Sequence, residues 1–156
     1  MNDFSEREQG QILIDKDGQW RYEGAPIVRQ DIVALLSEHL VQGEDGSYWI
    51  LWQGQECRIE VEDTPFVVWG VSPVQEERDT VAIILHLNDG SMELFDPTTL
   101  TIGSENVPYC RVKKGRFRAR FSRKAYYQLA RMIEEEEGGF FLKLGERKYP
   151  VQHEPS

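Results

Sequence analysis

Short apolar runs separated by tight-turn signals constrain the fold of this chain more than any other feature. Two such runs, 11–14 and 19–22, flank Asp15-Lys-Asp-Gly18, and a second pair, 80–87 and 91–95, flanks another Asp-Gly turn. Asp-Gly between apolar runs is typical of β-hairpins. Because a parallel connection needs a dozen or more residues, these hairpin-length connections predict purely antiparallel sheets.

Two segments have the spacing of amphipathic helices, 29–40 and 123–134, and Gly138-Gly139 stops the second. The acids 134–137 are expected to fray its end, where the helix dipole disfavours negative charge. The expected buried faces consist of apolar side chains at helical spacing: Ile32, Leu35, Leu36 and His39 in the first helix, and Tyr126, Leu129, Ala130 and Ile133 in the second. The pattern predicts an α+β fold with roll-like sheets.

A polar segment, 73–79, is the best candidate for a linker between two small lobes. It separates an N-terminal α+β lobe, 11–72, from a C-terminal β-rich lobe with one helix, 80–151. The remaining residues are expected to form a flexible N-terminal tail, 1–10, and a C-terminal tail, 152–156.

The two lobes look like copies of one helix-plus-antiparallel-hairpin unit. A shift of 94 superposes the first helix on the second, and a shift of 92 superposes the hairpins, placing the triplet 48–50 on 140–142. Both triplets have two aromatic residues followed by an aliphatic one, which favours a duplication. The alternative is that any helix followed by a hairpin agrees about this well.

Charge is distributed unevenly along the chain. The formal net charge is -9, yet residues 111–131 hold 9 of the 18 Lys and Arg residues and no acid. A net acidic chain disfavours non-specific binding to nucleic acid, which depends on neutralising phosphates. The basic stretch still creates a local positive field where anions gather.

Within this stretch, Arg116, Arg118 and Arg120 alternate with Phe117, Ala119 and Phe121. In a strand, this period places the three guanidinium groups on one face and the rings on the other. Such a row binds phosphate or carboxylate well. The alternative is a solvated sheet face whose charges are balanced by the chain's own acids.

Bulk composition excludes several classes of protein. Hydrophobic content of 40% and charged content of 29% are typical of a globular domain, and no apolar run approaches the ~18 residues of a membrane span. Residues 1–10 lack the features of a signal peptide. Cys57 and Cys110 are isolated, which favours reduced thiols and a cytoplasmic location.

Short motifs along 11–151 carry a family resemblance. In the first half they are Asp17-Gly18, Trp20, Tyr22, Gly24, Pro26-Ile27, Arg29, Ser37, Asp45-Gly-Ser-Tyr48, Ile59, Val61-Glu-Asp63 and Pro65-Phe66. In the second half they are Pro108-Tyr109, Val112, Gly115, Arg120, Arg123, Tyr127 and Leu129. These residues resemble the bacterial domain-of-unknown-function family 1285. The chain departs from the family's pattern at 33–36 and 51–55.

The resemblance implies two small α+β or β-rich lobes with repeated motifs and a cleft between them. It also implies a nucleotide-like ligand and a role in signalling. It implies no catalytic residues. Trp20 and Arg29 are candidate ligand contacts mainly because of this resemblance, and Trp20 has core packing as its alternative role.

Two matching elements, Asp63-Thr-Pro-Phe66 and Asn106-Val-Pro-Tyr109, each join an Asx residue, a proline and an aromatic residue. Asp and Asn in such a setting often close a turn on their own backbone. The functional alternative is that Asp63, Phe66 and Tyr109 line the walls of a ligand site.

No signature of catalysis or metal binding occurs in the sequence. No Ser or Cys stands in a nucleophile motif, no His, Cys or acids have metal-ligand spacing, and no glycine loop opens a helix. We therefore predict no cofactor, no metal site and no catalytic residues.

The predicted function is a cytoplasmic, non-catalytic ligand-binding or sensory module. It binds an anionic, nucleotide-like small molecule between two lobes, and Arg116, Arg118, Arg120 and Arg123 contact the negative groups. The alternative is a protein-interaction adaptor whose basic strand, 111–124, docks an acidic partner or mediates self-association. No membrane partner is expected.

Overall fold

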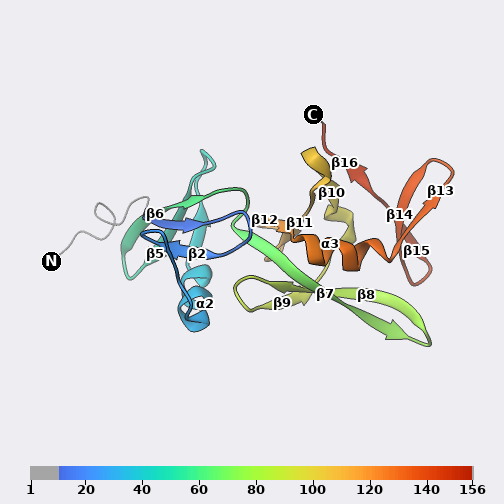
Figure 1. Cartoon of the computed structure of the whole chain (residues 1–156), viewed down its shortest axis with the longest axis horizontal. Helices are drawn as coiled ribbons and strands as arrows, with labels where there is room; N and C mark the ends of the chain where they lie inside the picture. The colour runs from blue at the N-terminus through green and yellow to red at the C-terminus, as the bar shows by residue number, and fades with distance from the viewer. Residues whose placement is uncertain (1–10, 156) are drawn as a thin grey trace. The chain divides into compact units, whose positions relative to one another are not determined.

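The computed structural model describes residues 11–155 and divides between Pro65 and Phe66 into two compact units (Figure 1). Among the described residues, the fold is mostly β-sheet, with two α-helices and several sheets. No helix within 11–155 is long and apolar enough to cross a membrane. The expected N-terminal tail, 1–10, lies outside the described residues.

The first unit is built on a six-stranded sheet in the order β3-β2-β1-β6-β5-β4. Its strands are β1 (Ile12–Ile14), β2 (Trp20–Tyr22), β3 (Ala25–Pro26), β4 (Leu40–Gln42), β5 (Tyr48–Trp52) and β6 (Gln55–Val61). One helix, α2 (Gln30–Glu38), lies between β3 and β4 in the chain.

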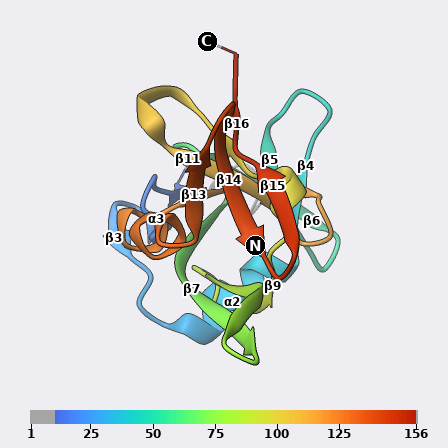
Figure 2. The same ribbon diagram turned by 90° about the vertical axis from the view of Figure 1, so that its right-hand side faces the viewer.

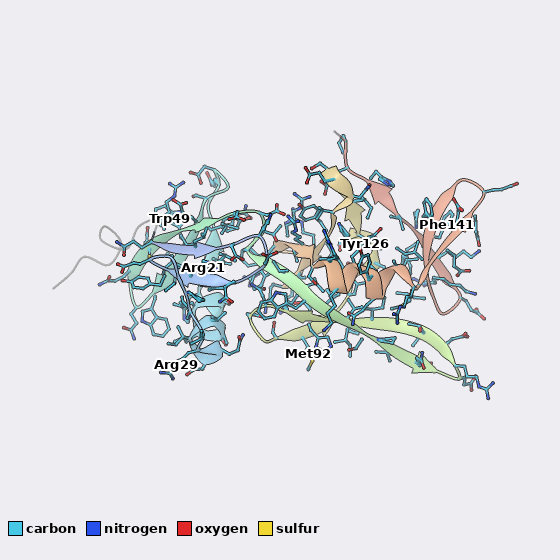
Figure 3. The ribbon with its side chains drawn as sticks, in the orientation of Figure 1. Arg21, Arg29, Trp49, Met92, Tyr126 and Phe141 are labelled. Carbon is cyan, nitrogen blue, oxygen red and sulfur yellow. The ribbon has the colours of Figure 1, made fainter. Side chains whose placement is uncertain are left out.

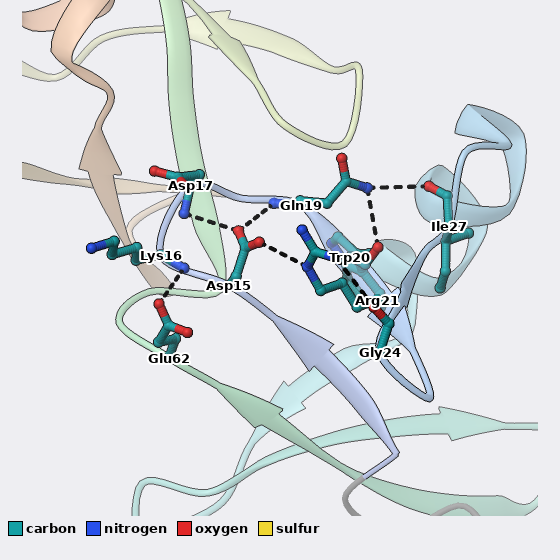
Figure 4. A network of polar contacts seen from close by, with 9 residues as sticks. All are labelled: Asp15, Lys16, Asp17, Gln19, Trp20, Arg21, Gly24, Ile27 and Glu62. Carbon is teal, nitrogen blue, oxygen red and sulfur yellow. Dashed lines mark hydrogen bonds and ion pairs between the residues drawn. The ribbon is translucent and has the colours of Figure 1, made fainter.

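The hairpin expected at 15–18 is confirmed, since β1 and β2 pair antiparallel around it. The Asp15 carboxylate closes the turn by accepting hydrogen bonds from the backbone N–H groups of Asp17 and Gln19 (Figure 4). Its second oxygen pairs with Arg21 Nε at 3.1 Å. Directly after this turn Trp20 is buried, with 1% of its surface exposed, so its ring is part of the core.

The expectation of purely antiparallel sheets is wrong. β1 pairs with β6 in parallel, with Leu13 opposite Glu60. Almost the whole first unit, including α2, connects these two strands, which is ample length for a parallel crossover. Local turn signals predict neighbouring hairpins but not the pairing of strands far apart in the sequence.

Helix α2 does not bury the face that its apolar periodicity predicted. Its buried residues are Val33 and Ser37, whereas Ile32 is 37% and Leu35 is 40% exposed. Positions 33 and 37 are one turn apart and lie on one face of the helix. The short Ser37 side chain lets this face of α2 lie close to the rest of the unit. The burial of Leu35 expected from the sequence is therefore wrong.

The second unit contains a seven-stranded sheet in the order β16-β10-β11-β12-β7-β8-β9. Its strands are β7 (Phe66–Glu76), β8 (Asp79–Leu87), β9 (Met92–Leu94), β10 (Thr101–Ile102), β11 (Pro108–Val112), β12 (Phe117–Phe121) and β16 (Gln152–His153). Two 3-10 turns, Pro97–Thr99 and Ser104–Asn106, flank β10. Parallel pairing occurs here too, between β7 and β12 and between β10 and β16.

A second, three-stranded sheet in this unit consists of β13 (Ile133–Glu136), β14 (Gly139–Leu144) and β15 (Arg147–Pro150), side by side in Figure 2. The glutamates at 134–136 therefore belong to an extended strand rather than to a frayed helix end. Their side chains are exposed. β13 lies at the edge of its sheet and pairs only with β14.

Residues 73–79 are not a linker. They form the end of β7 and the start of β8, which pair antiparallel as far as Glu76 and Asp79. Glu77 and Arg78 have φ of 48° and 78°, the left-handed conformation of a tight hairpin turn. The end of this hairpin is exposed to solvent and therefore consists of polar residues. A linker has a similar composition, which explains the wrong prediction.

Helix α3 (Arg123–Ala130) packs against β7 and β12. Ser122 caps its start, since its Oγ accepts a hydrogen bond from the Ala125 N–H at 3.1 Å. The helix buries Ala125 and Leu129 completely, so the expected burial of Leu129 is confirmed.

Candidate functional site

Strands β11 and β12 place several cations on one face of the seven-stranded sheet. Arg111 lies directly opposite Arg118, and Tyr109 lies opposite Arg120. Residues paired across antiparallel strands share a face, so these four side chains lie together. Thr101 of β10 extends the same face, because it pairs with Tyr109.

The Arg118 guanidinium makes two contacts of different kinds on this face. Its carbon lies 3.7 Å from the centroid of the Tyr109 ring, a close cation–π contact. One of its terminal nitrogens donates to Glu154 Oε2 at 2.5 Å, and Thr101 Oγ1 donates to the same oxygen at 2.7 Å. An arginine, a hydroxyl and an aromatic ring thus surround one carboxylate.

Gly103 allows this arrangement because it has no side chain. A Cβ at Gly103 would lie 2.8 Å from Tyr109 Cε2 and 3.2 Å from Glu154 Oε1. Its φ of -90° is ordinary for any residue, so space rather than backbone conformation demands glycine here. The tyrosine ring and the carboxylate occupy the volume that a side chain would take.

Arg116 does not join the other arginines on this strand face. β12 begins at Phe117, and Arg116 lies in the preceding turn, where Lys113 and Lys114 have φ of 56° and 60°. Its guanidinium lies 5.6 Å from the centroid of the Phe117 ring, and its Nε donates to the Lys113 carbonyl at 3.4 Å. The pleat that places Arg118 and Arg120 together therefore does not extend to Arg116.

Phe66 and Tyr109 lie on opposite faces of the sheet. Phe66 pairs in register with Ala119, whose side chain points away from the arginines, and Phe66 is 1% exposed. Its ring lies 5.4 Å from that of Phe117, and the Lys113 ammonium lies 5.2 Å from its centroid. Phe66 belongs to the core face.

The Lys113 ammonium is anchored beside this core by a buried carboxylate. It donates to Asp89 Oδ2 at 2.9 Å and to Ser91 Oγ at 2.8 Å. Burial alone would raise the pKa of Asp89, but hydrogen bonds from Ser91 and Lys113 outweigh it, so the pKa lies below its usual value. The cluster holds a charged carboxylate in place.

The other candidate residues belong to other elements than the strands of the Arg118 face. Arg123 is exposed at the first position of α3. Trp20, Arg29 and Asp63 belong to the first unit: Trp20 in its core, Asp63 half-buried, and Arg29 at the exposed start of α2, where it pairs with Asp31 at 2.6 Å (Figure 3).

Sequence reasoning missed Glu154, Thr101 and Gly103. Glu154 was assigned to a C-terminal tail, whereas residues 152–153 form strand β16 and Glu154 continues its ladder by donating from its N–H to the Ile102 carbonyl at 2.9 Å. The contact between Glu154 and Arg118 joins residues 36 apart. A two-residue strand has too little periodicity to be predicted.

Two surface cavities of the second unit lie elsewhere. The larger, of about 850 Å³, is lined by Glu76, Glu77, Asp79, Val81, Gly145, Glu146 and Arg147. The smaller, of about 250 Å³, is lined by Asp79, Thr80, Arg131, Met132, Glu134, Lys143 and Gly145. Neither cavity includes a residue of the Arg118 face.

The buried Cys110 has no reactive thiolate. It lies opposite Ala119 on the core face of the sheet. Burial raises the pKa of its thiol strongly, and the nearby carboxylates of Glu93 and Asp96 raise it further. A nucleophilic cysteine needs the opposite environment.

Comparison with known proteins identifies the first unit. Residues 4–64 match the N-terminal domain of the domain-of-unknown-function family DUF1285. This unit is similar to a DUF1285 N-terminal domain. The family resemblance predicted from the sequence motifs is thereby confirmed. No curated protein matches the chain.

Two crystal structures of DUF1285 family proteins are similar to most of this chain. The protein from Silicibacter pomeroyi DSS-3 is 25% identical, with a TM-score of 0.74, over 92% of this chain and 80% of that chain. The protein from Shewanella baltica OS155 is 18% identical, with a TM-score of 0.64, over 80% of this chain and 93% of that chain. At 18% identity the second likeness shows the fold alone.

Proposed function

We propose that the chain is a non-catalytic binding module for an anionic ligand. Its anion contact is Arg118, on the face of the seven-stranded sheet shared with Tyr109 and Thr101. The observation that carries this proposal is the carboxylate of Glu154, which Arg118 and Thr101 already hold at 2.5 and 2.7 Å. The chain itself thus shows which chemistry fits this position.

The charge of the surrounding face supports the same proposal. Arg111 and Arg118 lie directly opposite each other, and like charges in that position destabilise a sheet. A bound anion relieves this repulsion, and the flat guanidinium group can donate two parallel hydrogen bonds to a carboxylate or phosphate. Tyr109 fixes the guanidinium from one side and so orients it before a ligand arrives.

Among anionic ligands, a nucleotide-like molecule is the class that family resemblance suggests, and small carboxylates are the class that the Glu154 contact suggests. Either ligand has to displace the Glu154 carboxylate. The exposed fractions of the Arg118 and Glu154 side chains, 37% and 31%, favour such an exchange, because exposed ion pairs contribute little to stability.

A thermal-shift panel tests this proposal. Nucleotides, inorganic phosphate and dicarboxylates are added to the full-length chain. A ligand at 100 times its dissociation constant stabilises the folded state by about 2.7 kcal/mol, which raises the Tm measurably. We expect a rise for at least one anion, and a larger rise in the Glu154→Gln variant.

The matched variants are Arg118→Gln and Arg147→Gln, which remove the same charge from two different sheets. Arg118→Gln should abolish the rise and Arg147→Gln should retain it. An unchanged Tm across the whole panel, or an equal rise in the Arg118→Gln variant, would contradict an anion site at Arg118.

The cytoplasmic location remains part of the proposal. Both cysteines of the chain, Cys57 and Cys110, are buried and unpaired, which fits a reducing compartment. Fractionation of cells that express the tagged chain tests this point. Recovery in a secreted or membrane fraction would contradict it.

We also propose that the chain contains an internal repeat. Both α2-β4-β5-β6 and α3-β13-β14-β15 consist of a helix followed by three antiparallel strands. The hairpin registers support a shift of 92, since Ile50 pairs with Cys57 and Leu142 pairs with Tyr149.

The helix faces support the same shift. A shift of 92 places the buried Val33 and Ser37 of α2 on the buried Ala125 and Leu129 of α3. The shift of 94 expected for the helices places Val33 on the exposed Tyr127 instead. An alignment of homologous sequences in which positions 92 apart share no side-chain pattern would contradict the duplication.

A further inference from the structure

The outer edge of the seven-stranded sheet is completed by the end of the chain. β16 pairs in parallel with β10, with Gln152 opposite Thr101 and His153 opposite Ile102 (Figure 1). Glu154 then donates its backbone N–H to the Ile102 carbonyl at 2.9 Å. The chain therefore shows in its own structure how an extended segment adds to this edge.

Side chains of the sheet bind one residue of that segment, Glu154. Glu154 lies two residues after Gln152, on the same side of the strand, and this spacing brings its carboxylate to Arg118 and Thr101. Gly103 leaves the space that the carboxylate and the Tyr109 ring occupy. The edge thus combines a backbone ladder with side chains that hold an acidic side chain.

The bound segment is held weakly. β16 has only two residues, so few ladder hydrogen bonds hold it on β10. The ion pair between Arg118 and Glu154 is about one-third exposed on both sides, so it contributes little. A competing extended segment with an acidic side chain can therefore replace residues 152–154 with little loss of free energy.

Resting on the anion site proposed above, we propose that the β10 edge is a docking groove for an extended acidic peptide of a partner protein. Residues 152–154 occupy the groove within the same chain and compete with that peptide. The peptide adds a parallel strand to β10 and places a glutamate or aspartate on Arg118. Strand addition to an exposed sheet edge is a common mode of peptide recognition.

The backbone of β10 favours a peptide over a small anion as the occupant. A small anion can replace the Glu154 carboxylate on Arg118, but it gives no backbone N–H to the Ile102 carbonyl, which accepts one from Glu154. An extended peptide satisfies the carbonyl and the guanidinium together. Unpaired groups on a sheet edge attract a further strand.

Fluorescence anisotropy with a labelled peptide of the sequence of residues 149–156 tests this proposal on the full-length chain. The Glu154→Ala variant, in which residues 152–154 lose their contact with Arg118, should bind the peptide at least about tenfold more tightly than the wild type, since a hydrogen bond to a charged group is lost from the competitor. A peptide with glutamine in place of Glu154 should bind about tenfold more weakly.

Two matched variants complete the design. Arg118→Gln in the Glu154→Ala chain should lose the binding, and Glu146→Ala, which removes an exposed glutamate from a different sheet, should bind as the wild type does. A thermal melt of each variant verifies that it is folded. Equal binding of the acidic and the glutamine peptide, or of all variants, would overturn the docking groove.

The outcomes separate the peptide from the anion site on which it rests. If small anions stabilise the chain through Arg118 but the Glu154→Ala variant binds no peptide, the docking groove is overturned and the anion site stands. If neither small anions nor the peptide bind, both the anion site and the docking groove are overturned. A wild-type dimer in sedimentation that Glu154→Ala dissociates would assign the groove to a second copy and overturn the partner peptide.

Discussion

At the scale of single residues, the second unit contains two carboxylates in different settings. Asp89 is 6% exposed and accepts hydrogen bonds from Ser91 and Lys113. Glu154 is held by Arg118 and Thr101, but its side chain is 31% exposed. The first carboxylate stabilises the loop after β8, and the second is available for exchange.

Asp89 makes stability depend on pH in the acid range. Its pKa is lower in the folded chain than in the unfolded chain, so its contribution is fully present above the unfolded value of about 3.9 and is lost as the pH falls through the folded pKa. The free energies of unfolding of wild type and Asp89→Asn, measured by urea denaturation, should differ most at pH 7, and the difference should shrink as the pH falls below about 3.9. A constant difference across this range would contradict the assignment.

Gly103 permits a second prediction at this scale. Gly103→Ala meets no backbone strain at φ -90°, yet its Cβ would displace the Tyr109 ring or the Glu154 carboxylate. We expect the thermal stabilisation by anions to disappear while the variant remains folded. The control is Ser104→Ala, at an exposed position next to Gly103. A glycine such as Gly54 cannot serve as the control, because its φ of 79° would strain an alanine. Anion stabilisation that persists in Gly103→Ala would contradict a site built on this contact.

At the scale of elements, several turns and hairpins followed from the sequence, the β7–β8 hairpin did not, and helix faces followed only in part. The β1–β2 hairpin and the buried Leu129 were predictable because they depend on residues close in the chain. The buried face of α2 was not predictable, because a small Ser37 rather than the apolar Leu35 lies against its neighbours. Parallel pairing depends on strands far apart in the sequence.

The two helices provide a matched pair of substitutions. Leu129→Ala removes a fully buried side chain and should lower the free energy of unfolding by about 2–5 kcal/mol. Leu35→Ala, at a position 40% exposed, should cost much less. Denaturant midpoints measure both effects. Equal losses at the two positions would contradict the helix faces described above.

At the scale of the whole molecule, the candidate site was only partly predictable. Arg118 and Arg120 lie on one face as strand alternation indicated, and Tyr109 lies opposite Arg120 on the same face. Arg116 does not, because a left-handed turn precedes β12. Glu154 completes the site from the end of the chain, and a contact over 36 residues leaves no local signal in the sequence.

The anion site on β10, β11 and β12 is tested most directly by nuclear magnetic resonance titration of the isotope-labelled, full-length chain with succinate. The largest shifts should occur at the backbone amides of Thr101, Ile102 and Gly103 and at the Arg118 guanidinium, with none in helix α2. Arg118→Gln should abolish them. Shifts centred on the cavity lined by Glu76 and Arg147, or no shifts at saturating succinate, would contradict an anion site at Arg118.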